Sequence, residues 1–160
     1  MIYVTVGTQL PFDRLIRAVD EWCAVSGADV FAQVGPSDGN FSALKSESFI
    51  TPEKADALMK EADLVVAHAG MGTIITATQC GKPLIIMARE FKYGEHRNDH
   101  QVATAKRFED FPNITVVADE AELKQALDAF DTSASSPFAA GTKYAPDEFI
   151  NNLKLLIADS

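Results

Sequence analysis

Cysteines and long apolar runs are both scarce in this sequence of 160 residues. The two cysteines, Cys23 and Cys80, lie far apart in the chain, which argues against a disulfide framework or a four-cysteine metal site. No apolar run approaches the roughly 18 to 20 residues that a membrane-spanning helix requires. The first residues, MIYVTVGTQL, have neither the basic region nor the cleavage pattern of a signal peptide. We therefore expect a cytoplasmic protein in a reducing compartment.

Positive charge is also scarce, since 14 Lys and Arg stand against 23 Asp and Glu and the formal net charge is -9. Proteins that bind nucleic acid without sequence preference depend on many Lys and Arg side chains. We therefore expect no nucleic-acid partner, and any anion must be bound at a local site. The remaining composition, with 47% hydrophobic residues, is that of an ordinary globular protein, and the length favours a single domain over residues 1–160.

Short β-rich runs alternate along the chain with segments whose apolar residues recur at helical spacing. The expected strands cover 2–6, 29–34, 63–67, 84–87 and 114–117, and the expected helices cover 12–22, 52–61, 73–80, 97–108, 120–130 and 147–158. The segment 131–146 is rich in Ser, Ala, Gly and Pro, which predicts a loop before the closing helix. This alternation predicts a Rossmann-like α/β fold, with a mostly parallel sheet and helices on both of its faces.

Two glycine turns follow expected strands, at the sheet edge where α/β proteins bind ligands. In the first, Gly7 allows close approach to the main chain and the hydroxyl of Thr8 can donate to an anion; a tight turn without a ligand explains it equally well. In the second, Gly70 and Gly72 allow close contact, and Thr73 can cap a helix whose free N–H groups suit a phosphate. The second turn predicts a diphosphate site, with a plain glycine turn and a capped helix as the alternative.

The second turn departs from the common nucleotide-binding fingerprints. Ile75 stands where a dinucleotide fingerprint has its third glycine, and the turn follows a middle strand instead of the first. No Lys-Ser or Lys-Thr pair follows any glycine run. These departures argue against NAD or FAD binding and against P-loop ATPase chemistry.

The third turn, residues 88–101, is a polar loop that runs into an expected helix. Its cations Arg89, Lys92 and Arg97 can meet anionic ligand groups. The run Asn98, Asp99, His100 and Gln101 offers the mixed donors and acceptors that sugar hydroxyls need. A solvated helix start is the alternative explanation.

All three histidines, His68, His96 and His100, follow strands at the same expected edge, and the last two are one helical turn apart. This spacing raises the hypothesis of a metal-dependent hydrolase, whose third ligand would be His68, Glu95 or Asp99. The pair lacks the glutamate of a zincin motif. We expect no metal and keep the hydrolase as an alternative.

Two longer strings carry a family resemblance: HAGMGTIITATQCGKPLIIM at 68–87 and GEHRNDHQVATAKRF at 94–108. They resemble the carboxyl-terminal, donor-binding half of GT-B glycosyltransferases related to the peptidoglycan N-acetylglucosaminyltransferase. The resemblance is strongest to the small subunits of two-part enzymes, which include the dolichol-linked N-acetylglucosaminyltransferase catalytic subunit and bacterial exopolysaccharide subunits similar to glucuronosyltransferases. The string GEHRNDHQ favours the bacterial group, and the resemblance covers essentially the whole chain.

The resemblance implies a role for each matching residue. The donor diphosphate would lie near Gly7, Thr8, Gly70, Met71, Gly72 and Thr73, and the donor sugar near Asn98, Asp99, His100, Gln101, Arg89 and Arg97. Many relatives hold the ribose through a glutamate where this chain has Thr76, a weaker partner with a single hydroxyl.

The function implied is that of the donor-binding catalytic subunit of a two-part inverting glycosyltransferase. It would move a sugar from a UDP-sugar to a polyprenyl-diphosphate-linked saccharide in exopolysaccharide synthesis. The loop cations favour glucuronate, while N-acetylglucosamine and glucose stay open. A membrane-associated partner subunit would recruit the chain to the inner membrane face, bind the acceptor and supply the base, with His68 and His100 as candidates within this chain.

Such a subunit would need no metal or other cofactor, and an exposed apolar surface would let the isolated chain form a homodimer. A non-catalytic nucleotide-sugar-binding regulatory or stabilising subunit would use the same phosphate turns.

Overall fold

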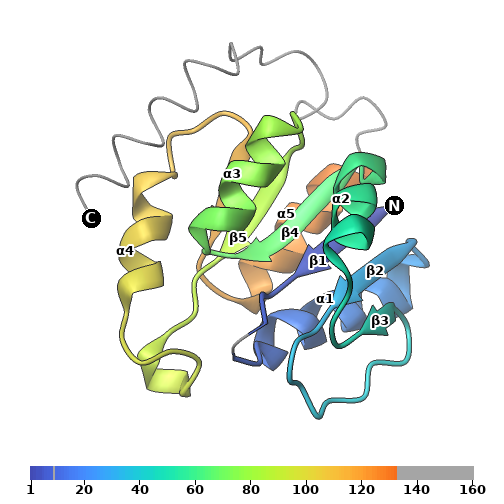
Figure 1. The fold of residues 1–160 in the computed structure, drawn as a ribbon, viewed down its shortest axis with the longest axis horizontal. Helices are drawn as coiled ribbons and strands as arrows, with labels where there is room; N and C mark the ends of the chain where they lie inside the picture. Colours follow the sequence, from blue (N-terminus) through green and yellow to red (C-terminus); the bar gives the residue numbers. More distant parts are fainter. Residues whose placement is uncertain (9, 133–160) are drawn as a thin grey trace.

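A computed structural model describes residues 1–8 and 10–132 of the protein (Figure 1). Within them, six strands form one sheet in the order β3-β2-β1-β4-β5-β6, and every pair of neighbours is parallel. The strands are β1 Ile2–Thr5, β2 Val30–Gln33, β3 Lys45–Glu47, β4 Leu64–His68, β5 Leu84–Met87 and β6 Ile114–Val117. The helices are α1 Asp13–Ser26, α2 Pro52–Glu61, α3 Met71–Gln79, α4 His100–Arg107 and α5 Glu120–Thr132, with a 3-10 helix η1 at Phe91–Tyr93. The Rossmann-like α/β prediction is confirmed, whereas the expected closing helix 147–158 lies outside the described residues.

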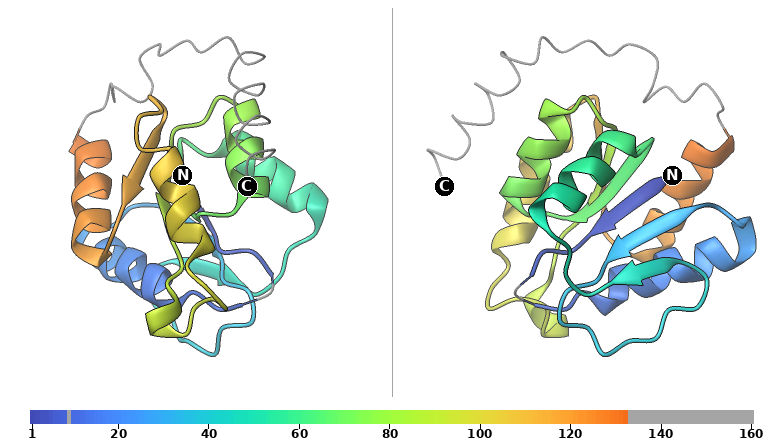
Figure 2. Two further views of the ribbon diagram at one scale, coloured as in Figure 1. Left: turned by 90° about the vertical axis from the view of Figure 1, so that its left-hand side faces the viewer. Right: turned by 45° about the vertical axis from the view of Figure 1, so that its right-hand side comes forward.

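Helices cover both faces of the sheet, with α1 and α5 on one face and α2, α3 and α4 on the other (Figure 2). Successive strand residues point to opposite faces, so Val66 packs in the core beside α1 while Val65 packs in the core beside α3. Both faces of the strand are therefore buried. This burial explains why β4 reads as a continuous apolar run instead of an alternating one.

Helix α1 is held on the sheet by apolar side chains at helical spacing, among them Leu15, Val19 and Trp22. It continues to Ser26, one turn beyond the expected end at residue 22. Gly27 closes it in a left-handed conformation with φ 70°, and its N–H donates to the carbonyl of Cys23 at 2.9 Å.

The edge strand β3 was not predicted. Its three residues, Lys45–Glu47, are all exposed, so they carry none of the apolar pattern by which a strand is recognised in a sequence. The helix that follows was predicted with its bounds. In the structure Pro52 occupies its first turn and the Thr51 hydroxyl accepts from Lys54 N–H at 3.1 Å, which stabilises this start.

Candidate functional site

The three predicted turns lie at one edge of the sheet, because β1, β4 and β5 are neighbours and all parallel. The chain leaves β1 toward β2 on one side, and β4 lies on the other side, so the strand order reverses between β1 and β4. Open α/β sheets bind ligands at this switch point, beyond the carboxyl ends of the strands. The edge formed by the segments after β1, β4 and β5 is therefore the candidate site.

The turn after β1 is shaped by Gly7, whose φ of 77° lies in the left-handed region that favours glycine. Its carbonyl accepts from Gln33 Nε2 at 3.0 Å, and the same amide group donates to the Ser48 carbonyl at 2.8 Å. The Thr5 hydroxyl donates to the other end of the Gln33 amide at 2.9 Å. Gln33, which the sequence did not mark, therefore fixes the turn that carries Gly7.

The imidazole of His68, at the end of β4, packs against two of the predicted glycines. A Cβ atom on Gly70 would lie 2.3 Å from its Cε1 and 2.7 Å from its Nε2, closer than packed atoms approach. A Cβ atom on Gly7 would lie 3.3 Å from the same Nε2. Gly70 is therefore required by the packing of His68, a reason that differs from the predicted approach of a ligand to its backbone.

The opposite holds for Gly72, where a Cβ atom would meet no described atom within 4 Å apart from its chain neighbours and the backbone of its own helix. Gly70 is the N-cap of α3, and no side chain of residues 1–8 and 10–132 caps this end of the helix. The first N–H groups of α3 therefore have no side-chain acceptor within the described part of the chain, and the helix dipole favours an anion there. This geometry suits the predicted diphosphate contact at Gly72.

The expected cap at Thr73 is wrong, because α3 begins at Met71, two residues earlier. The N–H of Ile74 already donates to the carbonyl of Gly70 at 3.1 Å, which places Thr73 inside the first turn. Met71 packs its side chain against the core, and the Thr76 hydroxyl donates to the carbonyl of Gly72 at 2.9 Å. The Thr76 oxygen keeps acceptor capacity, so the predicted ribose contact stays a prediction.

Arg89, predicted to meet an anionic ligand group, is instead bonded to main-chain carbonyls. The residue is 3% exposed, and its Nη1 donates to the carbonyls of Pro11 at 2.8 Å and Glu95 at 3.4 Å. Its Nη2 donates to the carbonyls of Leu10 at 2.9 Å and Val6. Sequence alone reveals the charge of Arg89 and not its partners, and these partners leave its Nη groups committed inside the protein.

Gln101 links the third turn to His68. Its Oε1 accepts from the Arg89 N–H at 3.1 Å, so its amide nitrogen faces His68 Nδ1, 3.3 Å away. His68 Nδ1 must then accept, which assigns the ring proton to Nε2. Burial, and next the charges of Arg89 and His96, lower the pKa of His68 to about 4. A neutral ring with both nitrogens assigned in this way is a hydrogen-bond donor at neutral pH and a poor general base.

The remaining predicted sugar contacts lie in an exposed segment before and at the start of α4. Asn98 Oδ1 accepts from the His100 N–H at 2.8 Å, and Asp99 Oδ1 accepts from the Phe91 N–H at 2.9 Å. The side chains of Arg97 and His100 are exposed. The residues lie at the predicted edge of the sheet, and their contacts with a sugar stay a prediction.

The helical pairing of His96 and His100 is wrong, since α4 begins at His100 and His96 precedes it in an irregular loop. Over residues 1–8 and 10–132, no group of three or more His, Cys, Asp and Glu is placed to hold a metal ion. His96 Nδ1 is buried without a hydrogen-bond partner from the described residues. Such an atom costs about 1–3 kcal/mol of folding free energy, so folding does not explain why a histidine stands there.

Several of the predicted site residues line two separate hollows. One, of about 250 Å³, is lined by Gly7, Thr8, His68, Arg89, His96 and Gln101. The other, of about 380 Å³, lies between α2 and α3 and is lined by Gly72, Thr73 and Thr76. The structure thus gathers the glycine turn after β1 with the polar loop after β5, and places the exposed side of α3 in the second hollow.

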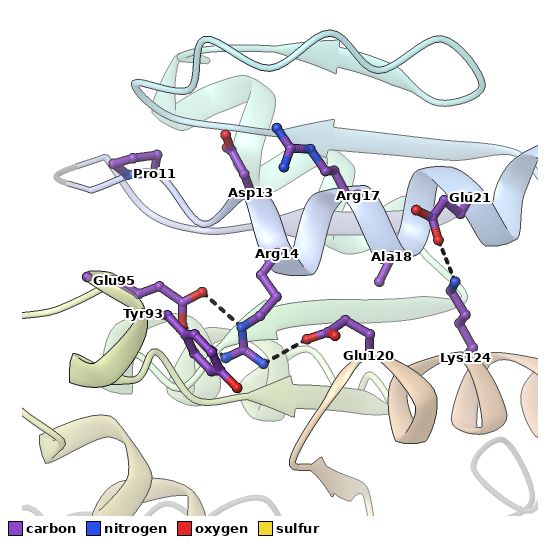
Figure 3. A pocket seen from close by; sticks show the side chains of 11 residues that line it. Pro11, Asp13, Arg14, Arg17, Ala18, Glu21, Tyr93, Glu95, Glu120 and Lys124 are labelled. Atoms are coloured by element: carbon purple, nitrogen blue, oxygen red, sulfur yellow. Dashed lines mark hydrogen bonds and ion pairs between the residues drawn. The ribbon is translucent and has the colours of Figure 1, made fainter.

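A larger hollow, of about 600 Å³, contains an ion cluster that the sequence did not reveal (Figure 3). Arg14 of α1 donates to both carboxylate oxygens of Glu95, each at 2.9 Å, and to Glu120 of α5 at 3.0 Å. Its guanidinium also lies over the ring of Tyr93, 4.6 Å from the centroid. Burial alone lowers the pKa of Arg14, but the hydrogen bonds that it donates to the two glutamates, together with their negative charges, outweigh burial and raise that pKa. The cluster ties the loop after β5 to α1 and α5.

Comparison with known proteins identifies the family to which this chain belongs. The chain matches the glycosyltransferase family 28 C-terminal domain over residues 1–156, and it belongs to that family. The UDP-N-acetylglucosamine transferase subunit ALG13 of Mus musculus is 32% identical over 116 residues, which are 66% of this chain and 10% of that protein. The Homo sapiens protein of the same name is 30% identical over 117 residues, again 66% and 10%. This chain thus covers about a tenth of the length of these curated relatives.

Solved structures show the same fold. The NMR solution structure of ALG13 superposes with a TM-score of 0.62 and 20% identity, over 95% of this chain and 94% of that one. A UDP-glucose: anthocyanidin 3-O-glucosyltransferase in complex with UDP superposes with a TM-score of 0.63 and 17% identity, over 99% of this chain and 40% of that one. The domain is therefore built like one half of a GT-B glycosyltransferase. No helix in the described part of the chain is long and apolar enough to cross a membrane.

Proposed function

We propose that this chain is the donor-binding subunit of a two-part, UDP-sugar-dependent glycosyltransferase. The observation that carries the proposal is the uncapped start of α3 beside the open side of Gly72, at the switch point of a family 28 domain. Two relatives are named as subunits of a UDP-N-acetylglucosamine transferase, and a longer glycosyltransferase contains this fold in 40% of its chain. These likenesses support an enzyme whose second half is a separate partner.

The chemistry required of the domain is stabilisation of the departing diphosphate in an inverting transfer. Main-chain N–H groups at the start of α3 can donate to the developing negative charge, so the proposal needs no metal. The acceptor hydroxyl also needs a base. Because His68 has a lowered pKa and both of its ring nitrogens are assigned, we place the base on the partner subunit.

N-acetylglucosamine is the first donor sugar to test, since the curated relatives are named for it. Three loop cations favoured glucuronate in the sequence. In the structure Arg89 is bonded to main-chain carbonyls, and Lys92 Nζ forms an ion pair with Glu90 Oε1 at 3.6 Å, so both have partners inside the protein. A carboxylate contact would therefore fall to Arg97. We keep glucuronate and glucose as further candidates.

For the acceptor we propose a polyprenyl-diphosphate-linked saccharide of exopolysaccharide synthesis. A membrane-associated partner would bind it and hold this cytoplasmic chain at the inner membrane face. The support for this assignment is the resemblance of the GEHRNDHQ string to the bacterial subunits.

Calorimetric titration with UDP and with the three UDP-sugars tests the donor site. We expect Gly72→Val to weaken UDP binding by at least about tenfold, or about 1.4 kcal/mol, because its side chain would occupy the space open to the ligand. Ala24→Val on the exposed surface of α1 is the matched control and should bind UDP as the native chain does. Equal UDP affinity in all three chains would contradict the site. Turnover on adding partner and acceptor separates an enzyme subunit from a regulatory one.

A further inference from the structure

The side chain of Arg89 lies between the two loops that line the smaller hollow. Three of the carbonyls it binds, those of Val6, Leu10 and Pro11, flank the turn that carries Gly7 and Thr8. The fourth belongs to Glu95, in the loop that leads to α4. One guanidinium therefore joins the segment after β1 to the segment after β5, across about 80 residues of sequence, and its rigid fork of donors suits this task.

The main chain of Arg89 extends the same connection. Its N–H donates to the Gln101 side chain, which in turn faces His68 at the end of β4. Arg89 thus contacts two of the three segments that form the candidate site directly, and it is connected to the third, after β4, through Gln101. The guanidinium groups of Arg89 and Arg14 also lie over the ring of Phe12, at 5.0 and 5.5 Å from its centroid. Arg89 therefore also contacts the residue that precedes α1.

Burying the Arg89 guanidinium among neutral carbonyls carries a desolvation penalty that opposes folding. None of the carbonyls bound by the Arg89 side chain carries a full charge, and burial lowers the pKa of Arg89 to about 10 although the negative charge of Glu95 acts in the opposite direction. A buried charge that its surroundings compensate only in part opposes folding, and apolar side chains of similar volume often replace buried ions without loss of stability. The benefit of Arg89 is therefore to be sought in the geometry of the loops that it joins.

We propose that Arg89 is a positioning residue, which holds the loops after β1 and β5 in the arrangement that binds the donor without contacting the donor through its own Nη groups. The proposal rests on the proposed function, because it gives the two loops a shared ligand. Preorganised loops bind a ligand more tightly because less ordering accompanies binding.

The test combines UDP titration with amide hydrogen exchange on the full chain. Arg89→Met removes the donors and keeps much of the side-chain length, whereas Arg89→Lys keeps the charge but not the planar fork. The matched control is Arg17→Met, at an exposed position of α1. We expect Arg89→Met to speed exchange in residues 6–8 and 94–98, to leave exchange in α5 as it is, and to weaken UDP binding about tenfold. Arg89→Lys should fall between Arg89→Met and the native chain.

Hydrogen exchange needs no ligand, so it separates the two hypotheses. If the native chain binds no UDP while Arg89→Met still loosens both loops, the donor function is wrong but the connection between the loops holds. Weaker UDP binding with unchanged exchange would overturn the positioning role and indicate direct contact. Unchanged UDP binding in both variants would overturn it too. Should Arg89→Met fail to fold, the same criteria apply to Arg89→Lys.

Discussion

The substitutions Gly70→Ala and Gly72→Ala should change the free energy of unfolding in opposite directions, although both positions lie at the start of α3. The backbone of Gly70 has φ −93° and ψ 129°, which alanine adopts without strain. Its Cβ, however, would lie 2.3 Å from the His68 ring, and that ring is held between Gly7 and Gly70 and hydrogen-bonded to Gln101. At Gly72 the same Cβ would meet no described atom within 4 Å.

The magnitudes follow from these distances. Forcing an extra methyl group into a packed site costs about 1–3 kcal/mol, against about 0.4–1 kcal/mol regained from a less flexible unfolded chain. Gly70→Ala should therefore lose about 1–2 kcal/mol of unfolding free energy. Gly72→Ala should gain about 0.5–1 kcal/mol from helix propensity. In a chain of 160 residues, the two melting temperatures should differ by about 4–10 °C.

Urea unfolding of the two variants, each also made in a His68→Ala background, measures the effect. Truncating His68 removes the clash, so the penalty of Gly70→Ala should disappear there while the gain of Gly72→Ala persists. Equal stability of the two single variants would refute the packing argument. A Gly70→Ala penalty that survives in the His68→Ala background would refute it as well.

Two further changes test the charges around the site. His68 is neutral in the folded chain, with a pKa near 4 against 6.5 for the free side chain, so acidification protonates the unfolded state first. In urea unfolding, the free energy of unfolding of the native chain should fall by about 2 kcal/mol between pH 7 and pH 5, and that of His68→Gln should not show this fall. An identical pH dependence of the two chains would contradict the lowered pKa. Arg14→Met leaves the Glu95 carboxylate without its partner and should lower the free energy of unfolding by about 2–4 kcal/mol. Adding Glu95→Gln should recover part of this loss. A loss under about 0.5 kcal/mol would show that the ion pair is as weak as one on the surface.

Local sequence patterns were enough to predict most of the strands and helices. Apolar spacing predicted α2 with its bounds, and the order of strands and helices placed the three turns at one edge. The edge strand β3 was missed because its side chains are exposed. The pairing of Arg14 with Glu95 joins residues 81 positions apart, a relation that no local pattern encodes. Charge and position are visible in one sequence, whereas partners depend on tertiary packing.

The stretch AHAGMGTIITA shows how one motif can meet two separate physical demands. Its first glycine is explained by the fold, since the His68 ring occupies the space of the missing Cβ. Its second glycine is explained by nothing inside the described part of the chain, because it faces open space at an uncapped helix start. Folding would favour alanine there by about 1 kcal/mol. Gly72 is a residue that the fold does not require. It lies at the switch point of the sheet, beside N–H groups for which the described residues provide no side-chain acceptor, and there we expect the donor to approach the backbone.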